Sequence, residues 1–344
     1  MRLPFSKGLN FSKWFEAPSP QAIDFSKITE QDFINVKSIG VDIIRLPVKL
    51  HNMAEGDSYV LDSHFLDLLD RAVDWAEKHE IYLMLDNHSF HPTDPTDPEI
   101  ADILIPVWTQ LARRYKDRSG YLLYEILNEP HGIETKVWAP IQEKVVTAIR
   151  KIDSGRGIVV GGVNYNSLDE LLNVPVYNDD NIIYTFHFYD PYIFTHQGET
   201  WGHPPNLRNL KGLPFPSDAH AMPEIPPDLI GTWAEKAIQH SYMKEATAEA
   251  LAKQLDKAVL FSQEHGNIPL FCGEFGAHIP NILPEDRRRW YQTVTQLLEE
   301  RNISRASWDY FGNFGIFNTA QGGSFSGDLN VDIVEALGFS VPSS

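Results

Sequence analysis

Two glutamates stand at the ends of apolar runs that are typical of buried strands. Glu129 ends Ile126-Leu127-Asn128-Glu129, and Glu274 ends Phe271-Cys272-Gly273-Glu274. Two carboxyl groups in one site can divide the work, because one can carry a proton while the other stays ionised. A lone glutamate in such a position is usually a solvated loop residue, so the interpretation depends on what the neighbouring runs supply.

Four other apolar runs also end in polar or aromatic side chains. These side chains are Arg45, His88, His187 with Tyr189, and Trp308. Burying this many polar groups is unfavourable unless each is paired, so incidental placement is a poor explanation of the whole set. Together with the two glutamates they predict a polar ring at one rim of an apolar core.

Short apolar runs and longer amphipathic segments alternate along the chain. Helical spacing of apolar residues is clear in 62–78, 138–152 and 286–301. The predicted strands are Leu9–Phe15, Val41–Pro47, Ile81–Asn87, Tyr121–Asn128, Gly157–Gly162, Ile182–Phe188, Ile268–Phe275 and Arg305–Asp309. Alternation of this kind indicates parallel strands with crossover helices, and eight units favour a closed (β/α)8 barrel over an open sheet.

We expect one domain over residues 1–344, because no linker-like stretch divides the chain. Catalytic side chains of such barrels lie at the carboxyl ends of the strands, where the polar ring is predicted. Segment 190–233 interrupts the alternation of predicted strands and helices, and it contains many prolines together with Trp201 and Trp233. Its aromatic content favours an ordered wall or lid of the cleft.

Composition excludes some classes of partner. The net charge is −18, which argues against nucleic acid and anionic membranes, because binding phosphate needs positive charge. The single cysteine, Cys272, permits no intrachain disulfide; we interpret it as a buried small residue, with a nucleophilic thiol as the alternative. No apolar run has the length of a transmembrane helix, and the first residues lack the apolar core of a signal peptide. We expect a soluble monomer without cofactor or metal, and export stays open.

The strand-end motifs resemble those of glycoside hydrolase family 5, which includes many cellulases and mannanases. The resemblance covers nearly the whole chain. It is carried by 125–131 (Glu-Ile-Leu-Asn-Glu-Pro-His), by 273–277 (Gly-Glu-Phe-Gly-Ala), by the stretch from Asn10 through Glu16-Ala17-Pro18, and by 194–198 with Trp201. It implies a retaining hydrolase of β-linked polysaccharide, with β-1,4-glucan first, β-mannan second and dual activity open.

Roles for the residues follow from this resemblance together with the chemistry of glycoside cleavage. Glu129 would be the acid/base and Glu274 the nucleophile, with carboxyls about 5–5.5 Å apart as in retaining enzymes. Arg45 would favour the ionised form of Glu274, and Tyr189 would donate a hydrogen bond to it.

The remaining candidates would contact sugar. Asn128 would bind the 2-hydroxyl, His88 and His187 would bind hydroxyls or position the glutamates, and Trp308 would be the apolar platform. Weaker candidates for the same cleft are Trp201, His196, Glu16 and Asn10. Relatives often carry two adjacent histidines where this chain has His88-Ser89, so a sugar contact by His91 is a guess.

Three alternatives stay open on the sequence alone. A metal hydrolase would use His88, His91, His187 and His196, although no His-Glu-x-x-His motif is present. A non-catalytic carbohydrate-binding barrel would keep Trp308, Trp201 and Asn128. A Ser-His-Asp esterase lacks the Gly-x-Ser-x-Gly turn that it would need at a strand end.

Overall fold

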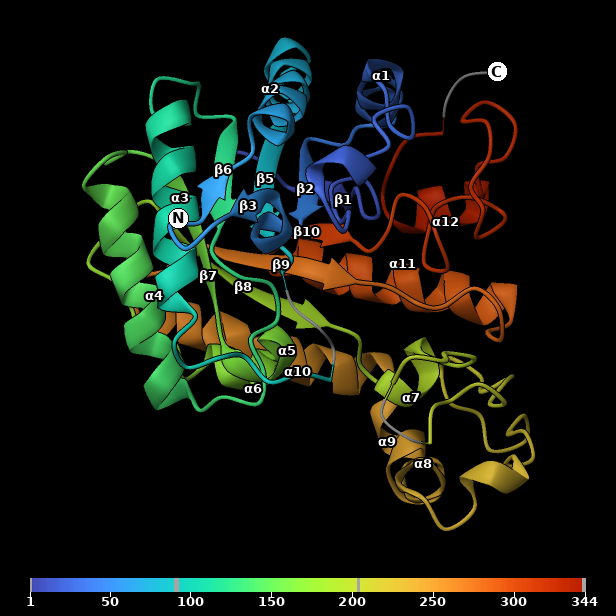
Figure 1. Ribbon diagram of the computed structural model, residues 1–344. Coiled ribbons are helices and arrows are strands. Elements are labelled where there is room, and N and C mark those ends of the chain that lie inside the picture. Colours follow the sequence, from blue (N-terminus) through green and yellow to red (C-terminus); the bar gives the residue numbers. More distant parts are fainter. Residues whose placement is uncertain (1, 90–92, 203–204, 342–344) are drawn as a thin grey trace.

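Eight parallel strands close into a barrel in the computed structural model, which describes residues 2–89, 93–202 and 205–341 (Figure 1). Around the barrel the order is β1-β10-β9-β8-β7-β6-β5-β2, and every neighbouring pair is parallel. The strands are β1 Lys7–Asn10, β2 Ile43–Val48, β5 Tyr82–Asn87, β6 Leu122–Glu125, β7 Gly157–Gly161, β8 Ile182–Phe188, β9 Leu270–Phe275 and β10 Ser304–Ser307. The predicted (β/α)8 fold class is confirmed.

Helices cover the outside of the barrel (Figure 1). They are α1 Glu30–Ser38, α2 Ser63–Lys78, α3 Ala101–Tyr115, α4 Thr135–Arg150, α5 Val163–Asn166, α6 Leu168–Leu171, α10 Ala248–Glu264, α11 Pro284–Glu300 and α12 Val331–Ala336. The three segments with predicted helical spacing correspond to α2, α4 and α11. In α2, Asp62 accepts a hydrogen bond from the backbone of Phe65, and the predicted apolar face is buried against the barrel.

The amino-terminal end of the barrel is filled by apolar side chains. Each of seven strands contributes a residue to a compact cluster that also includes Phe5, whose ring meets Phe271 edge-on at 5.8 Å. The cluster consists of Phe5, Ile43, Met84, Leu123, Val159, Ile183, Phe271 and Ala306. The apolar cluster fills this end of the barrel. Polar side chains that point into the barrel therefore lie towards the carboxyl ends of the strands.

The first predicted strand is wrong in its boundaries. It was expected at Leu9–Phe15, but β1 ends at Asn10. Trp14 and Phe15 instead join an aromatic cluster with Phe25 and Trp75 of α2. Phe15 keeps a single parallel bridge to Val48 at the end of β2, outside the continuous strand. The apolar character of Trp14 and Phe15 therefore reflects mainly their burial against α2.

The described parts of segment 190–233 carry short helices. The segment contains α7 Tyr192–Thr195, the 3-10 helix η3 Pro227–Leu229 and the start of α8 Trp233–Lys236; the π-helical turn η4 Ala237–Ser241 and α9 Tyr242–Glu245 follow. Leu207, Leu210, Leu213 and Phe215 are fully buried and give the segment its own apolar contacts. Figure 1 shows it as a projection beside the barrel near α7, α8 and α9.

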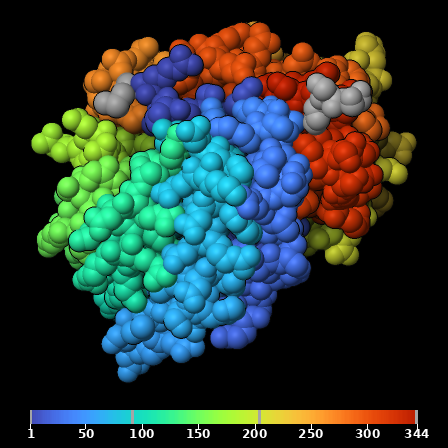
Figure 2. All heavy atoms as spheres, turned by 90° about the horizontal axis from the view of Figure 1, so that it is seen from above, coloured from blue at the N-terminus to red at the C-terminus, as the bar shows by residue number. Residues whose placement is uncertain are grey.

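Three short elements lie near the amino-terminal strands: the 3-10 helices η1 Pro20–Ala22 and η2 Leu50–Met53, and a hairpin of β3 Ala54–Glu55 and β4 Val60–Leu61. Segments from the early and the late part of the chain lie side by side, and blue and red surfaces adjoin in Figure 2. There β1 pairs with β10, and the backbone of Ser340 donates to Ile39. In the part of the chain that the structure describes, no helix has the length and apolarity needed to cross a membrane.

Candidate active site

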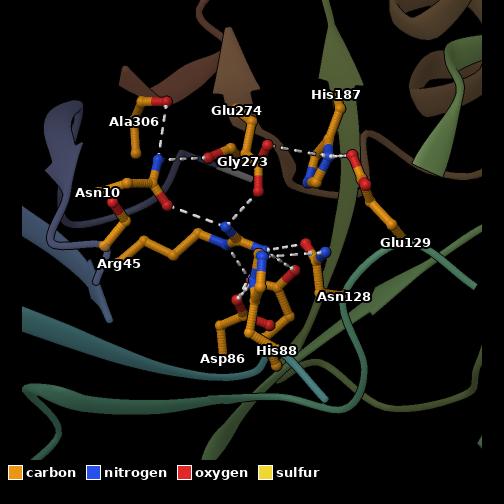
Figure 3. A network of polar contacts seen from close by, with 12 residues as sticks. Asn10, Arg45, Asp86, His88, Asn128, Glu129, His187, Gly273, Glu274 and Ala306 are labelled. Carbon is orange, nitrogen blue, oxygen red and sulfur yellow. Dashed lines mark hydrogen bonds and ion pairs between the residues drawn. The ribbon is translucent and has the colours of Figure 1, made fainter. Parts of the chain in front are cut away.

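Arg45 is the centre of a polar network at the carboxyl ends of the strands (Figure 3). Its guanidinium donates to Glu274 Oε1 at 2.7 Å, to Asn10 Oδ1 at 2.9 Å and to Asn128 Oδ1 at 2.7 Å. Burial acts against its charge, but the surrounding carboxylates outweigh burial and raise the pKa of Arg45 well above its ordinary value. The guanidinium is therefore a permanent positive charge beneath the cleft.

Two partners of Arg45 were not assigned a role from the sequence. Glu125 on β6 accepts from Arg45 at 2.7 and 3.0 Å, and Asp86 on β5 forms an ion pair with it at 3.0 Å. Both are almost completely buried. The sequence feature that could have identified them is a carboxylate inside an apolar strand, because burying such a charge is unfavourable unless a cation lies beside it. Arg45 occupies the same kind of position in β2.

Glu129 and Glu274 face each other across a small gap. His187 Nδ1 lies 2.8 Å from Glu129 Oε1 and 3.6 Å from Glu274 Oε2. One carboxylate oxygen of each glutamate and a ring nitrogen of His187 all lie within 4.8 Å of one another. Figure 3 shows the two carboxyls converging from separate segments on either side of His187.

Burial sets the protonation of this pair. It raises the pKa of Glu129 to about 7. Burial also raises the pKa of Glu274, while the positive charge of Arg45 acts against the rise. The predicted contact between Arg45 and Glu274 is present, but its effect on the pKa of Glu274 is smaller than that of burial.

His187 and Tyr189 come from the end of β8 and direct protons at the pair. Burial lowers the pKa of His187 to about 4, so the ring is neutral and, with its proton on Nδ1, donates to Glu129. The Tyr189 hydroxyl donates to Glu274 Oε2 at 2.8 Å, as predicted. Burial raises the pKa of Tyr189 well above its ordinary value, so this donor keeps its proton.

His88 lies between the network and Trp308. Its Nδ1 is 2.6 Å from Asp86 Oδ2, and its ring stacks on Trp308 with centroids 5.5 Å apart. Burial alone would lower the pKa of His88, but the charge of Asp86, its hydrogen bond to the ring and the charges of Glu16 and Glu274 together outweigh burial and give a pKa of about 9. Glu16 Oε1 is 3.9 Å from His88 Nε2, which places Glu16 at the same edge of the cleft.

The pair lies where two cavities meet. A cavity of about 410 Å³ reaches from Glu274 towards Trp308, Asp309 and Phe311. A second cavity of about 460 Å³ lies on the opposite side, and Tyr165 on α5 forms part of its wall. Residues that line both cavities are Glu129, Tyr189, His196 and Trp201. The result is a continuous cleft with reactive groups near its middle.

The other predicted sugar contacts differ in accessibility. Asn10 and Asn128 are fully buried, and Asn10 also donates to the Gly273 carbonyl at 3.0 Å. His196 is 7 % exposed and stacks under Tyr192, whereas Trp201 is 44 % exposed. His91 lies outside the described residues.

Three of the histidines proposed for a metal hydrolase, His88, His187 and His196, do not form one group. Within residues 2–89, 93–202 and 205–341, the one group of three side chains close enough to share an ion is Glu129, His187 and Glu274. His88 and His196 are not members. Cys272 is buried, as predicted, and burial raises the pKa of its thiol far above the ordinary value, which disfavours a nucleophilic thiolate.

The backbone conformation of Glu129 and the space around Gly273 explain features of the sequence next to the two glutamates. Glu129 has a left-handed backbone, with φ of 47°, which turns its side chain back over the barrel. A Cβ on Gly273 would lie 2.8 Å from Thr185 Oγ1 and 3.3 Å from His187 Nε2. Glycine before Glu274 therefore leaves room for the neighbouring His187 ring.

Comparison with known proteins agrees with this arrangement. The family description "Cellulase (glycosyl hydrolase family 5)" matches residues 7–313. Endoglucanase C of Acetivibrio thermocellus is 32 % identical over 334 residues, covering 91 % of this chain and 94 % of that protein.

Solved structures are similar over nearly the full length. The Clostridial cellulose synthase subunit Z of Clostridioides difficile has a TM-score of 0.80 at 26 % identity, covering 97 % of this chain and 99 % of that one. Endoglucanase Cel5A of Thermotoga maritima has a TM-score of 0.79 at 26 % identity, covering 96 % of each chain. Other structures of Cel5A hold cellobiose or mannotriose. With a barrel, an opposed glutamate pair and relatives that match across its length, the chain belongs to glycosyl hydrolase family 5 and is a glycoside hydrolase.

Proposed function

We propose that the protein is a retaining, endo-acting β-1,4-glucanase in which Glu274 is the nucleophile and Glu129 the acid/base. The observation that carries this proposal is the short distance between the two carboxyls, whose nearest oxygens lie within 4.8 Å. Retaining enzymes place the two groups about 5–5.5 Å apart, whereas inverting enzymes need about 6.5–9.5 Å to admit a water molecule.

In the first step Glu274 attacks the anomeric carbon. The bond from that carbon to the glycosidic oxygen breaks, and the oxygen takes the proton of Glu129. Arg45 and Tyr189 supply hydrogen bonds to Glu274 that stabilise its ionised form before attack. The pKa of about 7 leaves Glu129 protonated in mildly acidic solution, so that it can serve as the acid.

In the second step water replaces Glu274 at the anomeric carbon. The esterified Glu274 no longer carries a negative charge, so the pKa of Glu129 falls and its carboxylate accepts a proton from the water. The new carbon–oxygen bond forms as the ester bond to Glu274 breaks. Two inversions leave the product with the original β-configuration.

Trp308, Asn128 and His88 are proposed to hold the sugar that is cleaved. The Trp308 ring borders the cavity beside Glu274 and offers an apolar plane to the C–H face of a pyranose. His88 is positively charged and lies behind that ring, where it can donate to hydroxyls at the sugar edge. Asn128 is held by Arg45 at the same side of the site.

Glucan is the preferred substrate because two relatives that are 32 % identical to this chain are named endoglucanases. An endo mode of action is supported by a cleft that extends to both sides of Glu129. Mannan is the second candidate, since one structure of Cel5A holds mannotriose as its substrate. The two sugars differ in the orientation of the 2-hydroxyl, where one hydrogen bond contributes about 1 kcal/mol.

The test compares barley β-glucan, carboxymethyl cellulose, xyloglucan and glucomannan as substrates. We expect a ladder of short oligosaccharides from glucan, loss of activity in Glu274→Ala, and β-configured product in NMR spectra recorded during the reaction. The surface variant Arg114→Lys serves as the matched control. An α-configured first product would rule out the covalent mechanism. Release of mannan oligosaccharides alone would identify mannan, and not glucan, as the substrate.

A further inference from the structure

Three exposed aromatic side chains gather beside the cleft. Tyr192 is 41 %, Trp201 44 % and Trp233 40 % exposed, and in the described residues they are the aromatic rings among the large apolar side chains left open to solvent. Single apolar side chains are commonly exposed on protein surfaces, but exposed aromatic rings that lie together form an apolar patch. Such a patch is typical of a binding surface. Their ring faces are apolar while their edges tolerate water.

The three rings are arranged around the buried ring of His196. Tyr192 stacks on His196 with centroids 4.0 Å apart, and Trp201 approaches the same ring at 6.2 Å. Trp233 lies 6.2 Å from Tyr192. The three exposed rings are therefore linked by contacts that run from Trp201 through His196 to Tyr192 and on to Trp233, and we call this series the track.

The backbone near the start of the track is held by Glu199, which is buried. Its carboxylate accepts from the backbone of Trp201 at 2.7 Å, of Gly202 at 2.6 Å and of Leu207 at 2.9 Å. Further along, Thr232 caps α8 by accepting from the backbone of Ala234, which fixes the helix at whose first position Trp233 stands. Rings that are fixed before binding lose little conformational entropy when a ligand arrives.

The track continues one particular half of the cleft. Tyr192 lines only the cavity that contains Glu129 but not Glu274, Trp201 lines both cavities, and Trp233 lines neither. Because the proposed acid faces the leaving group, this half receives the part of the polymer that departs first. Figure 1 shows α7 and α8, which carry Tyr192 and Trp233, together in the projection beside the barrel.

We propose that Tyr192 and Trp233 form a distal binding surface for the leaving part of a neutral β-linked polysaccharide chain. This inference rests on the proposed function, since it takes the direction of the chain from the roles of Glu129 and Glu274. A neutral occupant fits because a net charge of −18 disfavours polyanions, and the aromatic faces match the C–H faces of pyranose rings. Binding at this distance raises catalysis for long chains, because energy from remote sugar units helps to hold the scissile bond in place.

The experiment uses the full-length protein and two substrates of different length. For the wild type, Trp233→Ala and the double variant Tyr192→Ala/Trp233→Ala, kcat/KM is measured on soluble barley β-glucan and on an aryl β-cellobioside. We expect the ratio of the two values to fall about threefold in the single variant and about tenfold in the double variant. Ile230→Ala is the matched control, because Ile230 is an exposed apolar residue of the same segment and lies outside the track.

An unchanged ratio in the double variant overturns the proposal. If the ratio is unchanged and the molar mass of the double variant, measured by light scattering, also differs from that of the wild type, the rings are a self-association surface and the proposal is overturned. If the wild type cleaves neither substrate, the proposed function fails separately. The track is then judged by migration in native gels containing β-glucan, where retardation lost in the double variant supports it and equal retardation contradicts it.

Discussion

At the scale of single residues, the acid–base balance of the cleft depends on Glu129. Its carboxyl is surrounded by protein, which makes the charged form less stable and raises its pKa to about 7. The nearby Glu274 has a permanent cation, Arg45, at 2.7 Å. Arg45 acts against the rise that burial causes in the pKa of Glu274, and the proposed division into acid and nucleophile requires Glu274 to lose its proton more easily than Glu129.

Replacing Glu129 with glutamine should affect substrates according to their leaving groups. For β-glucan, which needs a proton on the departing oxygen, we expect kcat/KM to fall about 10²–10⁴-fold. For a dinitrophenyl β-cellobioside, whose leaving group departs without a proton, the first step should keep most of its rate. Glu274→Gln is the comparison, and it should abolish both reactions, by about 10⁴-fold or more. Equal losses on both substrates in Glu129→Gln would contradict the acid role.

The pH dependence should have its alkaline limit at Glu129. The acid must hold its proton, so kcat/KM on β-glucan should decline as pH rises through about 7. Glu274 must be ionised, and its raised pKa places an acidic limit above the usual range of a glutamate. Both limits are measured from initial rates between pH 4 and 9. With the dinitrophenyl substrate in Glu129→Gln the alkaline limit should vanish, and its persistence would assign that limit to another group.

At the scale of elements, Arg45 joins strands that are far apart in the sequence. It extends from β2 and contacts Asn10 at the end of β1, Asp86 on β5, Glu125 on β6 and Glu274 on β9. Because the strands are parallel and close into a barrel, their carboxyl ends bring these partners to one place. The same contacts hold the reactive carboxyl in position and neutralise buried negative charge.

Arg45→Lys should be destabilising although it keeps the charge. An ammonium group cannot reproduce the several directed contacts of the guanidinium, so buried carboxylates would lose partners. We expect a loss of about 3–5 kcal/mol in the free energy of unfolding, measured by urea titration, together with a large loss of kcat. Arg114→Lys is the control, because Arg114 pairs with Asp70 near the surface and should cost less than about 1 kcal/mol. A urea midpoint equal to that of the wild type would contradict the structural role of Arg45.

At the scale of the whole molecule, several buried groups bind protons more tightly in the folded state than in the unfolded chain. Burial raises the pKa of Glu129 and of Asp309 to about 7 from 4.5 and 3.8, and nearby carboxylates together outweigh burial to give His88 a pKa of about 9. Stability from such groups is present at low pH and is lost as pH rises through the folded-state pKa. His51 and His187, with pKa values of about 4, act in the opposite sense below pH 6.5.

Stability should therefore decline between pH 6.5 and pH 9. In this range the two histidines with lowered pKa values contribute little to the change in stability. The carboxyls with raised pKa values and the His88 ring lose their protons. We expect Tm to fall by roughly 3–6 °C, measured by calorimetry at both pH values. Repeating the scan in 0.5 M salt separates surface repulsion, which salt screens, from the buried groups, which it affects little. A Tm that rises over this range would contradict the assigned pKa shifts.

The sequence by itself predicted the barrel and the candidate residues that the structure brings together at its carboxyl end. Periodic apolar residues identified α2, α4 and α11, and apolar runs ending in polar residues identified Arg45, Glu129 and Glu274, since both patterns depend on local spacing. It extended the first strand beyond Asn10, because Trp14 and Phe15 are as apolar as strand residues although they belong to an aromatic cluster that packs against α2. It also assigned no role to Asp86 and Glu125, since the partner that they share, Arg45, lies on a different strand.

Distances, burial and clustering were decided by the tertiary structure. The separation of the two carboxyls, the raised pKa of Glu129 and the five-residue environment of Arg45 all depend on how eight strands close around a common axis. The approach of Trp233 to Tyr192 depends likewise on how the segment after β8 folds back on itself. Local sequence specifies which side chain is present, whereas its electrostatic surroundings come from residues many positions away, and only the folded chain brings these together.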